Sequence, residues 1–358
     1  MIKTQVEPLE STDIPSKIQS FVDALENVLV IKDGHIIYNT VSDDFNAVEI
    51  KTYDQVDQTL ISDHHSNFTS DRDVVNYNYE NINGSLLIHI PKKIIVNEKL
   101  HVFYVQEHTD VVQNVSIILE EGSKLDYFEY LVNVNPGSVN FLSTTSVAKH
   151  AKLNYTVISN YDRQVAVSMN RIARVKENAT LNYTNGTFGD ALTDQDTSVY
   201  LDERYARAEA KTIALTNQAQ ETIIKTLVEH DAPETEGLIE HYGVVNDQSF
   251  LVFEGIGKIN KNMKQSVARQ SNKGVVLSKQ ARLDANPLLL IDEYDVVASH
   301  GAAIGKIDEE QLYYLMSRGL TRKAAEKLII NGFLKPVIDE IDDEPLKERF
   351  VHLVNSRI

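Results

Sequence analysis

The sequence of 358 residues contains no cysteine and no tryptophan. Without cysteine the chain cannot form a disulfide, and it offers neither a thiolate nucleophile nor a thiolate ligand for a metal ion. The absence of cysteine fits a reducing compartment, because disulfides stabilise mainly secreted proteins. We therefore expect a cytoplasmic protein.

Basic residues are in deficit: 35 lysines and arginines face 52 aspartates and glutamates, so the formal net charge is −17. Nucleic acids and anionic membranes repel such a chain, so neither is expected as its main partner. Long apolar runs are also missing, and Pro287–Ile291 is typical of the longest. Met1–Glu10 has no apolar segment, so no secretion signal is expected.

The common catalytic motifs are absent as well. The sequence has no Gly-x-x-x-x-Gly-Lys-Ser/Thr loop for phosphates, no Gly-x-Ser-x-Gly nucleophile turn and no His-Glu-x-x-His zinc motif. Gly255-Ile256-Gly257 lacks the third glycine of a dinucleotide site and is expected to precede a strand, where that motif needs a helix. None of these motifs therefore points to a catalytic site.

A repeat does occur. Glu121–Tyr127 is echoed by Lys149–Tyr155 and again by Glu177–Tyr183, which places the marker leucines Leu125, Leu153 and Leu181 at intervals of 28 residues. A looser copy, Tyr205–Ala208, follows 27 residues after Leu181, and Gln280–Ala285 has the same form. Self-similarity at a fixed period of this size indicates a stack of repeated units.

Within each copy the apolar residues alternate with polar ones, which is the period of a strand and excludes helical repeats. The sequence therefore predicts a mainly β fold with a parallel β-helix, or β-solenoid, core. We expect this core over residues 85–305, a mixed and partly helical region over 1–84, and a helical domain over 306–358. A β-sandwich with accidentally similar strands is the alternative.

Residues that commonly cap or end helices predict where the terminal helices lie. Residues 14–30 have apolar positions at helical spacing, with Asp13 as the expected cap and Pro15 in the first turn. At the other end, Asp308 and Thr321 are expected to cap two helices, the first ended by Gly319. Pro345 is expected in the first turn of a third helix.

Histidines and clustered carboxylates are the candidate ligands. Asp63-His64-His65 is expected in a solvated polar loop, because adjacent side chains of an extended segment point to opposite sides. His230, His241 and His300 lie in or near predicted strands, where a lone histidine usually satisfies hydrogen bonds. Asp292-Glu293 and Asp295 are candidates for paired acids, although a solvated turn explains them better.

One stretch resembles a known family. It contains Pro287-Leu288-Leu289-Leu290, then Ser299-His300-Gly301-Ala302, then Ile307-Asp308, and then Tyr313-Tyr314-Leu315-Met316-Ser317-Arg318-Gly319. This order and spacing is similar to the SufB/SufD family of the SUF iron–sulfur cluster assembly machinery. The resemblance extends over roughly residues 226–340. Ala298 stands where many SufD relatives have cysteine, and SufB chemistry requires cysteine, so the resemblance is to SufD.

The resemblance implies a right-handed parallel β-helix with helical segments at both ends. It implies a non-catalytic scaffold that pairs with a SufB-type subunit through the β-helix and binds SufC, an ABC-type ATPase, through C-terminal helices. The residues expected at the SufC contact are Leu312, Tyr313, Tyr314, Arg318 and Gly319. A homodimer of the isolated chain is left open.

The resemblance also assigns a metal role. His300 matches the family histidine proposed to help bind iron or a cluster at the interface with the partner chain, so we expect no cofactor intrinsic to this chain. Two alternatives remain: a β-helix polysaccharide lyase or hydrolase, and a solenoid with a purely structural role.

Overall fold

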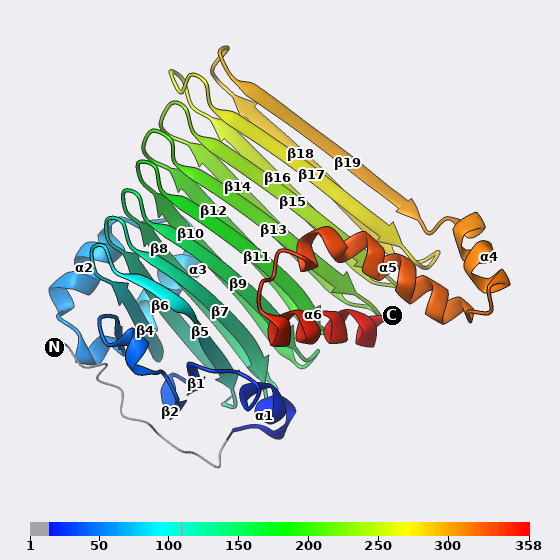
Figure 1. Cartoon of the computed structure of the whole chain (residues 1–358), viewed down its shortest axis with the longest axis horizontal. Coiled ribbons are helices and arrows are strands. Elements are labelled where there is room, and N and C mark those ends of the chain that lie inside the picture. Colours follow the sequence, from blue (N-terminus) through cyan, green and yellow to red (C-terminus); the bar gives the residue numbers. More distant parts are fainter. Residues whose placement is uncertain (1–13, 109) are drawn as a thin grey trace.

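The computed structural model describes residues 14–108 and 110–358, and shows two long sheets of stacked strands with helices at the flanks (Figure 1). The chain alternates between the sheets, so odd-numbered strands from β5 onward lie in a ten-stranded sheet A and even-numbered strands from β4 onward lie in a nine-stranded sheet B. From β4 to β19 every pair is parallel. The prediction of a mainly β, parallel solenoid is confirmed, with about 8 turns.

The bounds of the strands follow. Sheet A contains β1 (Val28–Lys32), β2 (His35–Asn39), β5 (Ile95–Gln106), β7 (Lys124–Asn133), β9 (Lys152–Tyr161), β11 (Thr180–Gly189), β13 (Arg207–Thr216), β15 (Glu236–Val245), β17 (Val267–Val276) and β19 (Val297–Lys306). Sheet B contains β3 (Glu49–Lys51), β4 (Gly84–Ile90), β6 (Asp110–Leu119), β8 (Gly137–Val147), β10 (Val165–Val175), β12 (Leu192–Leu201), β14 (Glu221–His230), β16 (Phe250–Ile259) and β18 (Arg282–Ile291).

The register confirms the repeat. Leu125 pairs with Leu153, Leu153 with Leu181, and Leu181 with Ala208, so the copies found in the sequence are successive rungs of sheet A. The copy at Gln280–Ala285 is different, because it leads into β18 of sheet B. A polar turn before an alternating strand occurs at both edges of the solenoid, so the pattern alone does not tell which sheet follows.

The turns that lead from sheet B back to sheet A share one conformation. His150, Asn178 and Tyr205 occupy it with φ of 61°, 55° and 63°, in the left-handed region. The amide of His150 donates to the carbonyl of Glu177, and that of Asn178 donates to Arg204 in the next turn. The turns are therefore stacked by backbone hydrogen bonds like the strands, which stabilises a left-handed residue that costs free energy by itself.

The interior of the solenoid combines apolar packing with one buried ion pair. Tyr127, Tyr155 and Tyr183 stack from turn to turn, with ring centroids 4.9 and 5.4 Å apart. Glu129 is fully buried, forms an ion pair with Arg171 from the opposite sheet and accepts a 2.6 Å hydrogen bond from the Tyr155 hydroxyl. Burial raises the pKa of this hydroxyl well above its usual value.

The N-terminal region differs from the sequence prediction. The helix α1 covers only Ser16–Val22, with Pro15 at its N-cap, and Val28–Lys32 is a strand that pairs with β5. The expected cap Asp13 lies outside the described residues. The helix cannot continue to residue 30 because Asn27 has φ of 53°, and the four residues from Val28 to Ile31 are all buried in the sheet.

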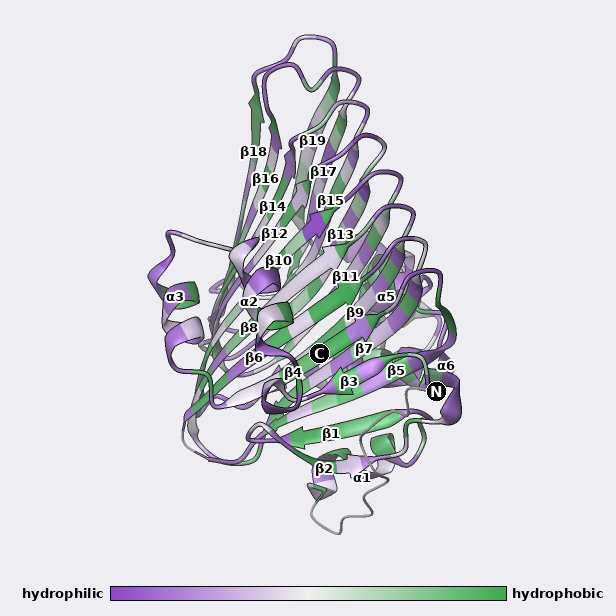
Figure 2. Cartoon of the chain, turned by 90° about the vertical axis from the view of Figure 1, so that its left-hand side faces the viewer, coloured by the Kyte–Doolittle hydropathy of each residue, from purple (hydrophilic) through white to green (hydrophobic). Residues whose placement is uncertain are grey.

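Two helices cover the outer face of sheet B (Figure 2). They are α2 (Gln58–Ser66) and α3 (Asp73–Glu80). The expectation of a solvated loop at Asp63-His64-His65 is wrong, because these residues belong to α2 and His64 is only 5% exposed. The His64 ring contacts the Thr144 hydroxyl at 3.0 Å, and the His65 ring contacts the Ser116 hydroxyl at 3.2 Å.

Three helices follow the solenoid as the capping signals predicted: α4 (Glu309–Ser317), α5 (Arg322–Ile338) and α6 (Glu344–Arg357). Asp308, Thr321 and Asp343 cap them with side-chain hydrogen bonds. The last two helices pack against sheet A and share one apolar cluster with α1. Phe350 is fully buried there because Gly186 leaves room, since a Cβ at 186 would lie 2.4 Å from the ring.

Ion pairs add to this packing. Lys211 of β13 contacts Glu340 at 2.7 Å, and Lys99 of β5 contacts Asp342 at 3.2 Å, so the connection between α5 and α6 is fastened to two distant turns. The arginine Arg349 donates to the Tyr130 hydroxyl at 2.7 Å. The helices α5 and α6 are therefore fastened to sheet A by ion pairs and hydrogen bonds as well as by apolar packing.

We predict that Phe350→Ala lowers the free energy of unfolding by about 3–5 kcal/mol, because it removes a fully buried ring and leaves a cavity against Gly186. Urea unfolding followed by circular dichroism measures the change. The matched control is Tyr313→Ala, an aromatic residue of α4 that is 76% exposed, for which we expect a change within about 0.5 kcal/mol. Equal effects of the two variants would contradict the packing described.

Stability should also depend on pH. Burial lowers the pKa of His64, His65, His230 and His241 from 6.5 to about 4. Between these values the unfolded chain binds more protons than the folded chain, so the free energy of unfolding falls as the pH falls from 6.5 to about 4.

Urea unfolding of the wild type and of His64→Gln at a series of pH values tests this dependence. The variant retains a polar group near the Thr144 hydroxyl and loses one buried titrating ring, so its stability should fall less steeply with decreasing pH. The control is His352→Gln, since His352 is exposed on α6 and makes no hydrogen bond or ion pair with the described residues. An unchanged slope in His64→Gln would show that His64 does not carry this dependence.

Candidate functional site

The two ends of the solenoid differ. At the N-terminal end β1 and β2 extend sheet A, and α1 packs in the apolar cluster beside it. At the other end β19 is the last strand of sheet A, so within residues 14–108 and 110–358 its outer edge pairs with no strand. All ten residues of β19 are exposed. A long open edge presents unpaired backbone donors and acceptors, which makes it a template for another strand.

Apolar side chains accompany this open edge. Val297 and Ile304 of β19 are 53% and 40% exposed, and Leu288 and Leu290 of the neighbouring β18 are 46% and 50% exposed. Large exposed apolar side chains next to an unpaired strand edge mark an interaction surface. We refer to β18 and β19 together as the open end.

His300 lies in the middle of β19. It is in parallel register with Gln270 of β17, whose side chain is buried in the interior, so His300 continues the inward-facing column beyond the last closed turn. Gln270 donates from Nε2 to the carbonyl of Leu288 at 2.7 Å, while its Oε1 has no partner in the described chain. His300 itself is exposed and makes no hydrogen bond or ion pair with the described residues.

The two glycines of Gly255-Ile256-Gly257 have a structural explanation. They lie inside β16, and not before a strand as the sequence suggested. A Cβ at Gly255 would be 2.9 Å from the Gln270 Oε1, and one at Gly257 would be 2.9 Å from its Nε2. The glycines therefore make room for the Gln270 side chain directly below the open end.

A metal ion would find few ligands in this chain. No group of three or more His, Cys, Asp or Glu side chains that could hold a metal occurs in the described residues. The rings of His230 and His241 are buried in the interior, where they contact Thr235 at 2.7 Å and Asn272 at 2.8 Å respectively. His300 is thus a single exposed imidazole, and iron bound there would need further ligands from another molecule.

The acidic candidates at Asp292, Glu293 and Asp295 belong to the turn after β18. Glu293 accepts backbone hydrogen bonds from Tyr294, Asp295 and Asn262, and the bond from Asp295 is the leading cause of its lowered pKa. A carboxylate that accepts three backbone amides stabilises a turn. These residues do not form the facing pair of acids that a glycoside-cleaving site requires.

The helix α4 stands away from the solenoid (Figure 1). Of the residues expected at a partner contact, Tyr313 and Tyr314 are 76% and 56% exposed, while Leu312 is 1% exposed. The Arg318 guanidinium lies 5.2 Å from the centre of the Tyr314 ring. Gly319 ends the helix with φ of 96°. The exposed face of α4 is therefore aromatic, with Leu312 turned away from solvent.

Sequence reasoning missed two features of this region. The inward position of Gln270 could have been found from strand parity, because His300 and Gln270 lie the same number of residues into their strands. The ion pair between Glu129 and Arg171 could not be found in this way, because it joins opposite sheets and depends on how the coils stack.

No helix in the described part of the chain is both long and apolar enough to cross a bilayer.

Comparisons with known proteins agree with this architecture. Residues 102–333 match the sequence profile of the SufBD core domain of the SUF system for FeS cluster assembly. The chain is 33% identical over 285 residues to the iron–sulfur cluster assembly protein SufD of Bacillus subtilis, which covers 77% of this chain and 65% of that protein. It is 25% identical over 275 residues to SufD of Escherichia coli, covering 76% and 63%.

A SufBD family protein of Staphylococcus saprophyticus is 25% identical over 266 residues, covering 73% of this chain and 57% of that protein. The aligned part therefore spans less than two thirds of the length of each of these relatives. The matched profile covers the solenoid from β5 to β19 and extends into α5. The chain belongs to the SufB/SufD family of iron–sulfur cluster assembly proteins of the SUF system, and it is of the SufD type.

Proposed function

We propose that this SUF component is a non-catalytic scaffold that pairs with a SufB-type subunit and a SufC-type ATPase and supports the acquisition of iron during cluster assembly. The observation that carries the proposal is the open end, where the ten-residue strand β19 has one unpaired edge and presents His300 among exposed apolar side chains. A scaffold needs a surface that a partner can complete, and the unpaired edge of β19 supports the proposal.

The SufB-type subunit would pair with β19. Its own last strand can supply the backbone partners that β19 lacks, and Leu288, Leu290, Val297 and Ile304 can be buried in the same step. The isolated chain can meet the same need by pairing with a second copy of itself. A homodimer of the purified chain is therefore compatible with a heterodimer in the complex.

Iron or a nascent cluster is cargo in this proposal. The chain has no cysteine, so it can offer only the His300 imidazole from its open end, and the partner must supply the thiolates. His300 is exposed and makes no hydrogen bond to the described residues, which leaves both ring nitrogens free for a metal and a supporting acceptor from the partner.

The SufC-type ATPase would bind the aromatic face of α4 through Tyr313, Tyr314 and Arg318. The inward face of α5 cannot take part, because Ile330, Leu334 and Val337 are buried against sheet A. Exposed tyrosine and arginine side chains are the types enriched at energetically important contacts between proteins.

The position of α4 next to β19 suggests how ATP hydrolysis by the partner could affect iron bound at the open end. Only Ile307 and Asp308 separate the end of β19 from the start of α4, so α4 is connected almost directly to the strand that carries His300. The helices α5 and α6 are held to sheet A by Lys211 and Arg349. A movement of the ATPase would then displace α4 and the edge strand relative to a fixed solenoid.

The metal role of His300 predicts the outcome of a copurification. The chain is expressed with its SufB-type and SufC-type partners, as wild type and as His300→Ala, and iron and sulfide are quantified without oxygen. We expect both complexes to form and the variant to lose most of its iron, because the one exposed imidazole of the open end is removed.

The control is His352→Ala. His352 is an exposed histidine of α6, a helix that packs on β11 and β13 and not on the open end. Iron retention unchanged by His300→Ala in an intact complex would show that the cargo site belongs to the partner alone. If no complex forms with the wild type, the scaffold proposal itself fails.

The ATPase contact gives a second prediction. The double variant Tyr313→Ser and Tyr314→Ser should weaken the binding of the SufC-type ATPase about tenfold or more, because it removes two exposed aromatic contacts. Binding of the SufB-type subunit should not change. Isothermal titration with purified ATPase measures the loss.

The matched control for the ATPase contact is Tyr77→Ser, since Tyr77 is a 52% exposed tyrosine on α3. Unfolding temperatures verify that all variants remain folded. ATPase affinity that is the same in the double variant and in Tyr77→Ser would place the contact elsewhere.

A further inference from the structure

The two unpaired edges of the open end differ in the backbone groups that they present. Within residues 14–108 and 110–358, β18 is the last strand of sheet B and β19 is the last strand of sheet A, so each has one edge without a neighbour (Figure 1). In a parallel ladder the N–H and C=O of one residue point to the same neighbouring strand, and successive residues point to opposite edges. One backbone hydrogen bond therefore fixes which residues of a strand face its open edge.

The open edge of β19 is continuous. The amide of Val297 donates to the carbonyl of Ser266, immediately before β17, at 3.0 Å, so the odd-numbered residues of β19 face β17. Its even-numbered residues face the open edge, and each of them has an N–H group. They are Ala298, His300, Ala302, Ile304 and Lys306. A further strand can therefore pair along the whole length of β19.

The open edge of β18 is interrupted. The amide of Arg282 donates to the carbonyl of Ser249 at 2.9 Å, and ten residues later the amide of Asp292 donates to the carbonyl of Ile259 at 2.9 Å. The even-numbered residues of β18 therefore face β16, and Pro287 lies in the middle of the open edge. Proline has no N–H, so a carbonyl of an added strand would find no donor at this position.

The side chains of β19 also suit pairing with a second copy of the same strand. Apart from His300, the only titratable residue of β19 is Lys306 at its end. In an antiparallel pair this lysine lies opposite the uncharged start of the other strand, so no like charges oppose each other. Val297 and Ile304 are exposed in the isolated chain, so pairing also covers apolar surface.

We propose that a second copy of this chain binds the open end through β19, and that Pro287 prevents the same strand addition at β18. Two copies are then joined by one ladder, in sheet A, and are held more weakly than copies joined through both sheets. Proline on an edge strand is a known means of limiting unwanted strand pairing. Pro287 thereby limits self-association at the end that the proposed scaffold function assigns to a SufB-type subunit, and this last clause rests on that function.

A substitution of Pro287 tests its role. Analytical ultracentrifugation of the purified full chain over a range of concentrations measures the dissociation constant of the dimer. Pro287→Val restores an N–H and keeps an apolar side chain, so the dimer should become about tenfold tighter or more. The matched control is Pro136→Val, in the exposed turn between β7 and β8, for which we expect the wild-type constant. An unchanged constant in Pro287→Val would reject the role of Pro287.

Two further variants test the pairing edge, because they place proline at adjacent positions of β19. Ala302→Pro removes an N–H that faces the open edge, so it should weaken the dimer about tenfold or more and leave the unfolding temperature close to that of the wild type. Ala303→Pro removes an N–H that faces β17 and should instead lower the unfolding temperature. A wild-type chain that is monomeric at every concentration, or a dimer unaffected by Ala302→Pro, would overturn pairing through β19.

These outcomes are distinguishable from a failure of the scaffold function. Self-association of the purified chain requires neither the SufB-type subunit nor the SufC-type ATPase. If the chain pairs through β19 as described but forms no complex in the copurification, the scaffold function is rejected and the pairing of two copies is retained. If the complex forms but Pro287→Val leaves the dimer unchanged, the assignment of Pro287 is rejected and the scaffold function is retained.

Discussion

Each coil of the solenoid pairs its backbone only with the coil before it and the coil after it, and this constraint governs the rest of the structure. Every strand from β5 to β17 pairs along both edges, while β18 and β19 each pair along one. A stack of this kind needs its ends to be covered or used. Here β1, β2 and α1 lie at the first end, and the second end is exposed, with His300 in its outermost strand. The candidate site is therefore a consequence of where the stack stops.

The interior of the solenoid contains a buried ion pair among its apolar side chains. The ion pair of Glu129 and Arg171 carries a desolvation cost of several kcal/mol per ion, which is offset only by good geometry and further hydrogen bonds. The Tyr155 hydroxyl supplies one such bond, and the Phe141 ring lies 5.1 Å from the guanidinium. The pair joins the two sheets across the interior of the solenoid.

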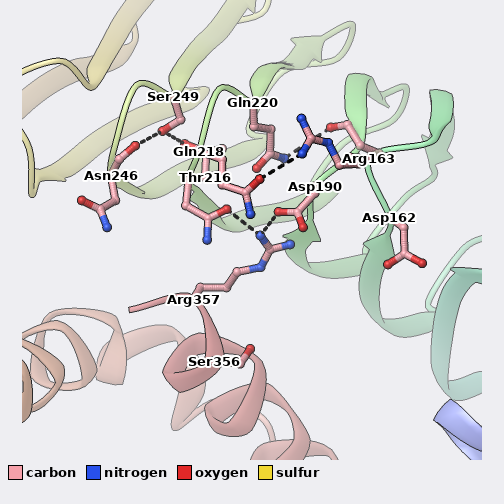
Figure 3. A network of polar contacts seen from close by, with 12 residues as sticks. Asp162, Arg163, Asp190, Thr216, Gln218, Gln220, Asn246, Ser249, Ser356 and Arg357 are labelled. Carbon is pink, nitrogen blue, oxygen red and sulfur yellow. Dashed lines mark hydrogen bonds and ion pairs between the residues drawn. The ribbon is translucent and has the colours of Figure 1, made fainter.

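The C-terminal helices α5 and α6 pack in the same apolar cluster as α1, which lies near the start of the chain. The helix α6 buries Phe350 over Gly186, and its last residue Arg357 is bound to Asp190 and Asn217 in turns of the solenoid (Figure 3). In contrast, α4 stands away from the solenoid (Figure 1) and exposes Tyr313 and Tyr314. The same C-terminal segment thus contains a rigid part and a projecting part, and the projecting part follows β19 directly. The proposal that α4 binds a partner while α5 and α6 stay fixed to the solenoid rests on this division.

The sequence by itself determined much of this architecture. The interval of 28 residues between Leu125, Leu153 and Leu181 predicts stacked strands, because equal spacing in a solenoid means equal positions in successive coils. The caps Asp308 and Thr321 predict the last helices, because capping is local chemistry. The lack of cysteine excludes a thiolate site, and the motif around His300 identifies the family.

Only the tertiary structure decided which side chains meet. The pair His64-His65 looks like a polar loop in the sequence, yet it is buried in α2, because the outer face of sheet B offers Thr144 and Ser116 as partners. The repeat does not reveal that Glu129 faces Arg171, or that Arg357 of α6 meets Asp190 in a two-residue turn of the solenoid. These are contacts between sheets or between a helix and the solenoid. They depend on the lengths of turns and on how the coils stack, which no local pattern of residues specifies.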